Sequence, residues 1–565
     1  MSNETEDKFQ VSTLIVKEIS DFINENRFDD AFTRLTSLSE RDIYEHTWDL
    51  TTYLLHLLEK PTDKLCNEYE LFSRDGITHL AEHGNPRELL IIMLEQSDRF
   101  ISDDEYAFHM KIFLTIIKRL PIKTSLITNL NDIYALLECH LTTIQLPKIS
   151  NEFSGNDLLV FNQDQRVNRL LKLVQLCVEF SCQIRDYFST ITPTIDVNPS
   201  LSKALLSILQ EPLISLSYEP INNQESSSMT LIQPLLNCLF SLKANPLQSI
   251  TNTTQQSVFI YLILTKSNYF SRLPCVYSPL FYLFLSIPAI QHLSHDRDQV
   301  MFTEKASVLL STVCARLTPN KQFDQTILDN DEFHILIDTL KMLMVQSPAR
   351  QYAPLTIGAY RALFQSFDSF GRYTFLRQQL AKTSLNEDSY RTFLCTLVKD
   401  EFLNDYRSGT SGIYRSTTLF QLLDYLCQLP HGIESDLLEI YDCLCSTLNF
   451  IRFIGLVDKQ NINRTLIWTD YLNRFNTNLL KPLRKSIDLA RAHYKLEIKN
   501  RADSLKKREV KQNPPTTDTE LLVDNTPLAM PSKQEQLGSL HTAVTKFDIL
   551  ECILSSLSDT FSGTL

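Results

Sequence analysis

The chain has 565 residues, of which 43% are hydrophobic and 21% are charged, values typical of folded soluble proteins rather than of disordered or fibrous ones. This length is enough for several ordinary domains or for one extended array. The net charge of −13 argues against a long contact with nucleic acid, because such contacts need clustered Lys and Arg, and no apolar run approaches the roughly 18 residues that span a membrane. We therefore expect neither nucleic acid nor a membrane as a partner.

Glycine is scarce in this sequence. There are 11 glycines, and only Gly76, Gly84 and Gly155 precede Gly358. Phosphate-binding loops and tight β-hairpins need glycine where the backbone takes a positive φ or comes close to a ligand. The composition therefore disfavours nucleotide-binding folds and hairpin-rich sheets.

Cysteine usage and the first residues bear on the compartment. The 12 cysteines stand apart along the chain, and Met1–Phe9 is polar and acidic. A secretory signal would show a basic start followed by an apolar run. We expect reduced, mostly buried thiols in a cytoplasmic protein.

Apolar residues at helical spacing predict amphipathic helices through most of the chain. The pattern is clear in Val167–Val178, in Phe333–Met344 before Pro348, and in Leu419–Leu429 before Pro430-His431-Gly432. It resumes in Leu437–Ile451. Because so short a break makes two amphipathic helices pack antiparallel, we predict a helical hairpin from Leu419 to Phe453.

The sequence thus predicts an all-α fold, an α-solenoid of about ten stacked antiparallel hairpins of HEAT or armadillo type. This prediction depends on helix length and pairing, because no fixed-period repeat is visible. Polar stretches at Ser150–Asn156, Pro193–Ser200 and Tyr218–Ser228 predict loops, and no stretch predicts a strand.

The C-terminal part changes character twice. Arg491–Lys511 is a highly charged helical stretch, and the segment after it holds four prolines with few apolar residues, which indicates a flexible linker. Leu537–Leu554 then carries an apolar face that needs cover, as a capping helix would. We divide the chain into helical regions 1–350 and 351–510, a linker 511–533 and a capping helix 534–565.

One string matches a catalytic motif. His79-Leu80-Ala81-Glu82-His83 fits the H-x-x-E-H pattern of inverted zinc proteases, with both imidazoles on one helical face. Catalysis would need a third ligand as well. Gly84-Asn85-Pro86 ends the helix at once, so both histidines stand where basic side chains favour the negative end of the helix dipole. We favour this second interpretation and expect no metal site.

The remaining strings are weaker. His292 with His295, Cys139 beside His140, and Cys443 with Cys445 form no spaced set of four ligands, and the chain has no C-x-x-C. Gly409-Thr410-Ser411-Gly412 resembles a nucleic-acid clamp as a string alone, since no strands are predicted beside it. Without a nucleophile elbow, phosphate loop or dinucleotide fingerprint, we expect a non-enzyme without a cofactor.

Several short segments form a recognisable series in chain order: Asn85–Leu90, Gly371–Thr374, Leu429–Leu438, Ser446–Arg452, Ile467–Thr469, Leu480–Leu483, Ala490–Asn500, Met530–Pro531, Leu540–His541 and Phe547–Asp548. Together they resemble the glomulin family, regulators of cullin-RING ubiquitin ligases. Most of residues 1–350 does not visibly resemble the family.

This resemblance implies a HEAT-like protein whose region 351–510 binds the RING subunit of cullin-RING ligases and masks the face used by the ubiquitin-conjugating enzyme. Immunophilins and a receptor kinase are further partners that the family suggests. Arg and aromatic side chains are common anchors of protein interfaces, so our candidate contacts are Arg407, Tyr414, Arg415, Arg452 and His493. The alternative for each is an ordinary solvated side chain, which is the more common role of such residues. The alternative function is a generic HEAT or armadillo scaffold or adaptor for another protein partner.

Overall fold

The structure is a computed structural model. It describes residues 2–58, 66–97, 102–121, 125–145, 163–190, 198–207, 229–241, 253–266, 270–271, 277–295, 300–317, 323–345, 352–385, 387–408, 412–459, 463–509, 522–523, 526–527 and 533–561. The chain forms two compact units: unit 1 is Met1–Val313 with Ser347–Tyr352, and unit 2 is Cys314–Gln346 with Ala353–Leu565.

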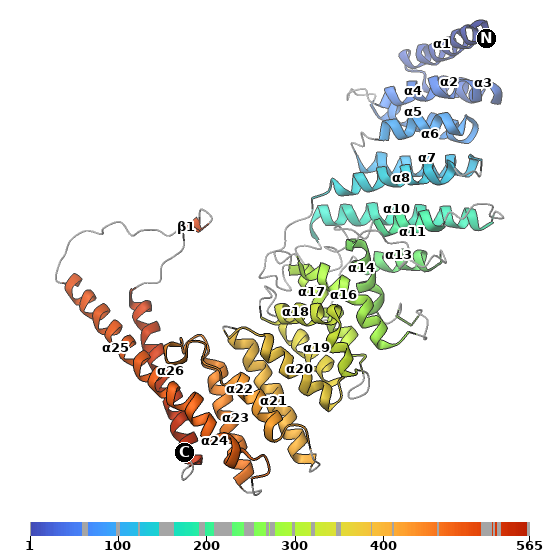
Figure 1. The fold of residues 1–565 in the computed structure, drawn as a ribbon. Coiled ribbons are helices and arrows are strands. Elements are labelled where there is room, and N and C mark those ends of the chain that lie inside the picture. Colours follow the sequence, from blue (N-terminus) through green and yellow to red (C-terminus); the bar gives the residue numbers. More distant parts are fainter. Residues whose placement is uncertain are drawn as a thin grey trace. The chain divides into compact units, whose positions relative to one another are not determined.

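The secondary-structure elements in the described residues of unit 1 are all helices (Figure 1). Its helices are α1 (Ser2–Asn24), α2 (Phe28–Thr36), α3 (Glu40–Glu45), α4 (Thr47–Leu58), α5 (Cys66–His83), α6 (Pro86–Ser97), α7 (Asp103–Arg119), α8 (Ser125–Thr142), α10 (Gln165–Thr190), α11 (Asn198–Ser207), α13 (Met229–Ser241), α14 (Thr253–Thr265), α16 (Pro279–His295) and α17 (Val300–Cys314), whose last residue passes into unit 2.

The start and end of α7 show how local sequence sets a helix. Ser102 accepts a hydrogen bond from the Glu105 amide while Glu105 reaches back to the Ser102 amide, a complete capping box. Acidic residues fill the first turn, and Lys118 and Arg119 stand in the last, which suits the helix dipole. Pro121 follows directly, and a proline restricts the residue before it to extended conformations.

Successive helices of unit 1 cover one another's apolar faces. Helix α4 packs on α5, α5 on α7, α7 on α10 and α10 on α13. Buried polar pairs join neighbours: Tyr106 Oη lies 2.6 Å from Cys177 Sγ, and Tyr134 Oη lies 2.6 Å from Ser181 Oγ. Since a buried polar group without a partner is costly, these pairs help to hold α10 in register with α7 and α8.

Unit 2 contains the remaining elements (Figure 1). They are η1 (Gln325–Asp329), α18 (Asp331–Val345), α19 (Ala353–Gln365), α20 (Ser369–Lys382), α21 (Asp388–Ser408), α22 (Ser416–Leu426), η3 (Gly432–Glu434), α23 (Tyr441–Lys459), η4 (Ile467–Tyr471), α24 (Leu472–Phe475), η5 (Asn476–Leu480), α25 (Lys481–Glu509), β1 (Leu522–Val523), β2 (Thr526–Pro527) and α26 (Lys533–Thr560). Elements η4 and η5 are π-helical turns.

Helix α26 packs on both α23 and α25. It runs antiparallel to α25, because Arg484 bonds to Ser558 near one end and Arg501 to Gln536 near the other. Phe547 and Leu550 belong to its buried face. The predicted terminal helix therefore has its apolar face covered by the two helices beside it.

A buried carboxylate fixes the turn after α23. Asp458 has no exposed surface and accepts hydrogen bonds from the Arg464 amide at 2.7 Å, the Thr465 amide at 2.9 Å and the Thr465 hydroxyl at 2.6 Å. Charge-assisted bonds of this kind are stronger than neutral ones. They hold Leu466 in a left-handed conformation, with φ of 63°, before η4 begins.

The all-α prediction is confirmed, and α10 and α18 contain the ranges predicted for them. Helices α22 and α25 cover most of theirs, since α22 ends at Leu426 and α25 at Glu509. Three further details differ. Helix α23 begins at Tyr441, so Leu437 lies before it although its side chain is buried. The last three residues of the predicted loop Pro193–Ser200 begin α11. Within the predicted linker, Leu522 and Val523 pair antiparallel with Pro527 and Thr526.

The loops predicted at Ser150–Asn156 and Tyr218–Ser228 lie outside the described residues, as does the rest of 511–532. The division of the chain at residues 350, 510 and 533 stays a prediction. Among the described helices, none combines the length and apolar character needed to cross a membrane.

Close packing at Gly455 gives a first test. A Cβ added to Gly455 would lie 2.3 Å from Cζ of Phe561, the residue after α26. We expect Gly455→Ala to lower the free energy of unfolding by about 1–3 kcal/mol, because overpacking forces neighbouring elements to shift. Thermal unfolding followed by circular dichroism measures this.

The matched control is Gly358→Ala in α19, where an added Cβ meets nothing within 4 Å. Alanine should stabilise that helix by about 0.5–1 kcal/mol. Equal effects of the two substitutions would contradict the assigned contact between α23 and the end of α26.

Candidate functional site

The five candidate contact residues lie on different elements of unit 2. Arg407 is exposed in the last turn of α21, and Tyr414 and Arg415 directly precede α22. Arg452 is half-buried on α23, and His493 is exposed on α25. The structure brings Tyr414 and Arg415 together at one carboxylate, whereas the other three side chains belong to three separate helices.

That carboxylate is Asp405 of α21. Its Oδ2 accepts a hydrogen bond from the Tyr414 amide at 3.1 Å and lies 3.9 Å from Nε of Arg415. A Cβ added to Gly412 would overlap the Asp405 carboxyl group, at 1.5 Å from Oδ1. Glycine therefore lets the backbone approach Asp405, which anchors the end of this loop to α21.

Tyr414 does not offer its ring to a partner. Its side chain is 2% exposed, and the ring meets that of Tyr373 edge-on, with centroids 6.2 Å apart. The expectation of a surface anchor at Tyr414 is thus corrected: the ring is buried against Tyr373 of α20. Sequence reasoning missed this because a tyrosine in a polar loop carries no signal of which way it turns.

A buried ion pair supports the same corner. Arg372 Nε lies 2.8 Å from Oε2 of Glu401, and Arg372 Nη1 donates to the Phe367 carbonyl at 2.6 Å. Burial raises the pKa of Glu401, and the Arg372 charge opposes that rise. Arg372 belongs to α20 and Glu401 to α21, so the pair connects these two helices. Separating the two side chains would leave a buried charge without a partner, which is costly.

Arg407 is exposed to solvent, whereas Arg452 is half-buried. The Nε of Arg452 is buried and has no hydrogen-bond acceptor among the described residues. Arg407 is exposed at the C-terminal end of α21, where a cation also favours the helix dipole. Both guanidinium groups are suited to a carboxylate of a partner, because their planar N–H groups match its two oxygens.

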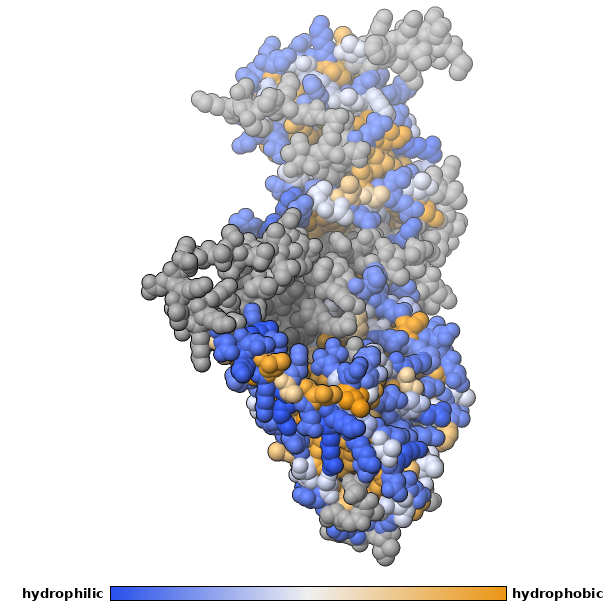
Figure 2. All heavy atoms as spheres, turned by 60° about the vertical axis from the view of Figure 1, so that its left-hand side comes forward, coloured by the Kyte–Doolittle hydropathy of each residue, from blue (hydrophilic) through white to orange (hydrophobic). Residues whose placement is uncertain are grey.

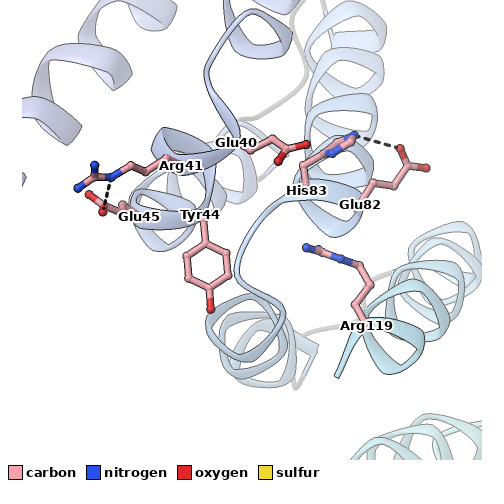
Figure 3. Close-up of a pocket in the computed structure, with 7 residues that line it drawn as sticks. All are labelled: Glu40, Arg41, Tyr44, Glu45, Glu82, His83 and Arg119. Carbon is pink, nitrogen blue, oxygen red and sulfur yellow. Dashed lines mark hydrogen bonds and ion pairs between the residues drawn. The ribbon is translucent and has the colours of Figure 1, made fainter. Parts of the chain in front are cut away.

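Unit 1 contains a separate open pocket of about 440 Å³. Figure 3 shows its seven lining residues: Glu40, Arg41, Tyr44, Glu45, Glu82, His83 and Arg119. They come from α3, the end of α5 and the end of α7. Arg41 and Glu45 pair with each other at 3.1 Å, so the pocket combines charges of both signs rather than favouring one class of ligand.

The end of α5 explains the two histidines of the zinc-like string. Arg119 Nη1 donates to the Ala81 carbonyl at 2.7 Å, and thereby satisfies one of the carbonyls left open at a helix C-terminus. The centroids of the His79 and His83 rings lie 4.6 Å apart. The pKa of His79 is lowered, mainly by burial and to a lesser extent by the neighbouring His83. No group of three His, Cys, Asp or Glu side chains within the described ranges is placed to hold a metal ion.

Cys182 of α10 and Cys238 of α13 interact, which the sequence analysis did not predict. A hydrogen bond from Cys238 lowers the pKa of Cys182 to about 7, and the positive charge of Arg185 acts in the same direction. Arg185 itself donates to Ser241 Oγ of α13 at 2.7 Å. The contact joins residues far apart in the chain, so no local motif could have predicted it.

This contact predicts an unusually reactive thiol. The rate of Cys182 alkylation by iodoacetamide should rise with a midpoint near pH 7, because the thiolate is the nucleophile. In Cys238→Ala the midpoint should move up toward the usual thiol value of about 8.5. Mass spectrometry of the Cys182 peptide measures the rate, and an unchanged midpoint in the variant would argue against the hydrogen bond.

Comparison with known proteins finds a matching family model, which lies mainly in unit 2. Residues 280–526 match the model of a family described as uncharacterised, YAP/Alf4/glomulin. The chain is 27% identical to glomulin of Homo sapiens over 300 residues, 53% of this chain and 48% of that protein. It is 27% identical to glomulin of Mus musculus over 299 residues, 53% of this chain and 49% of that protein.

The match thus spans about half the length of these curated relatives. The family match includes the segments from Gly371 to Asn500 that resemble glomulin, whereas those from Met530 to Asp548 lie beyond it. Over residues 280–526 this chain carries the sequence pattern of the YAP/Alf4/glomulin family, and its resemblance to glomulin is confirmed.

Proposed function

We propose that this chain is a non-enzymatic regulator that binds the RING subunit of cullin-RING ubiquitin ligases through unit 2. Bound there, it would block the ubiquitin-conjugating enzyme sterically and lower ubiquitination. The observation that carries this proposal is the similarity to glomulin, together with the match of residues 280–526 to its family.

The form of unit 2 supports a binding role. Its helices are fixed by buried contacts such as Tyr360 with Tyr390, whose hydroxyl groups lie 2.7 Å apart. A surface that is already ordered loses little conformational entropy on binding. Specific interfaces bury roughly 1,200 Å² or more in total, and we propose that stacked helices, arranged as an α-solenoid, provide this area.

Exposed cations indicate where such a surface could be anchored. Arginine is enriched among the residues that dominate binding energy. Arg407 is exposed, and Arg415 is tied to Asp405 at the same end of α21. We therefore propose that the end of α21, rather than the buried Tyr414, contacts the RING subunit. We also propose that the protein acts in the cytoplasm.

The alternative is a helical scaffold for another protein, with an immunophilin or a receptor kinase as examples suggested by the family resemblance. A scaffold of that kind would bind its partner without touching ligase activity. Fold similarity alone does not carry function, so the two are separated by binding and activity measured together.

Reversal of one charge tests the proposed contact. Isothermal titration of the full chain against a purified complex of cullin and RING subunit should give saturable binding with Kd on the order of 1 μM or below. We expect Arg407→Glu to weaken binding about tenfold, because it replaces an attraction by a repulsion. Inhibition of ubiquitin-chain formation should weaken in parallel.

Arg87→Glu serves as the matched control, since Arg87 is an exposed arginine on α6 of unit 1. Its Kd should equal that of the unaltered chain. Absence of binding at high micromolar concentration would reject the RING partner, and binding without inhibition would favour the scaffold.

A further inference from the structure

Among the described residues, helix α25 packs against α26 and, near its start, against η3 and the residue after it, where Ser486 Oγ lies 3.5 Å from the Ser435 carbonyl. On the side that meets α26, Arg491 pairs with Glu551 and, at 3.0 Å, with Asp548, and the rings of Tyr494 and Phe547 lie 5.4 Å apart. By helical periodicity, residues three and four positions apart share a face, so the side opposite these contacts can be read from the sequence.

The opposite side carries an apolar stripe. Leu489 is 59% exposed and Leu496 is 58% exposed, and Ala492 and His493 are exposed between them. Ala492 and His493 stand three and four residues after Leu489 and four and three residues before Leu496, which places all four on one face. The two leucines stand about 10 Å apart along the helix axis, or two turns. Apolar side chains on one face of an amphipathic helix recur at the same distance.

Lysines border this stripe. Lys485, Lys495 and Lys499 are exposed, and at 100° per residue they fall at one flank of the leucines. The three arginines of this part of the helix instead turn to α26, as the bonds of Arg484, Arg491 and Arg501 show. The exposed charge of this flank thus consists of three ammonium groups and the carboxylate of Asp488, which leaves it net positive in a chain whose net charge is −13.

Figure 2 brings forward the side of the molecule that carries α25 and α26 in Figure 1, and shows apolar surface there among hydrophilic side chains. Single exposed leucines are ordinary on protein surfaces. A stripe two turns long with a basic border is what an amphipathic helix with acidic flanks would match, through its apolar face and its charge.

We propose that the α25 outer face, formed by Lys485, Leu489, Ala492, His493, Leu496 and Lys499, is a docking surface for an acidic amphipathic helix of a protein partner. Two apolar side chains of that helix, two turns apart, would pack on Leu489 and Leu496. Its carboxylates would lie against the lysines. This surface goes beyond the proposed function, because it requires no RING subunit.

A labelled model peptide tests the surface on the full chain. The probe has about 18 residues, long enough for measurable helicity, with leucines at helical spacing and glutamates beside them. Fluorescence polarisation should show saturable binding with Kd on the order of 10 μM. A peptide of the same composition with its leucines dispersed around the helix should bind at least tenfold more weakly.

Two pairs of substitutions address the two parts of the surface. Leu489→Asp with Leu496→Asp should weaken binding at least tenfold, and Lys485→Glu with Lys499→Glu should do the same while removing most of its dependence on salt. Leu14→Asp is the matched control, since Leu14 on α1 is also 58% exposed. Its Kd should not change.

Far-UV circular dichroism checks that each variant keeps its helices, and the lysine pair remains informative if the leucine pair does not fold. An unchanged Kd in a folded variant of either pair would overturn the proposal, as would equal binding of the two peptides. Binding to phosphatidylserine vesicles without binding to the acidic peptide would also overturn it, in favour of a membrane surface.

Discussion

The rest of this structure depends on one constraint: each amphipathic helix has an apolar stripe that only a neighbouring helix can cover. Burying a leucine-sized side chain contributes about 1.5–3 kcal/mol, so covering these stripes outweighs every polar contact in the fold. In unit 1 the need is met by the sequence of contacts from α4 through α13. In unit 2 the last helix, α26, meets it for α23 and α25 together.

Buried polar groups then determine which arrangement of covered stripes is adopted. The Tyr106–Cys177 and Tyr360–Tyr390 pairs join helices at fixed positions, and Asp458 sets the backbone of the turn before η4. Burial raises the pKa of Tyr106 and of Tyr360, so both hydroxyl groups stay protonated. Buried polar groups of this kind fix how the helices pack. Only the side chains that remain exposed after this packing are accessible to a partner.

The two surfaces considered for unit 2 illustrate this division. At the end of α21, Asp405 and the Arg372–Glu401 pair hold the loop, while Arg407 extends outward. On α25 the arginines are used against α26, and Leu489 and Leu496 are left exposed. In both places the inner side of the helix is held by polar contacts, and a small number of charged or apolar side chains stay exposed.

The sequence by itself determined most of the helices and the resemblance to glomulin, because helical periodicity and short motifs are local properties that neighbouring residues carry. It located α10, α18 and α22, and its C-terminal segments indicated the glomulin resemblance before any comparison. Only the tertiary structure decided that Tyr414 turns inward, that Cys182 meets Cys238, and that Arg119 caps α5. The environment of a side chain is set by segments far away in the chain, and their approach depends on how whole apolar faces pack together.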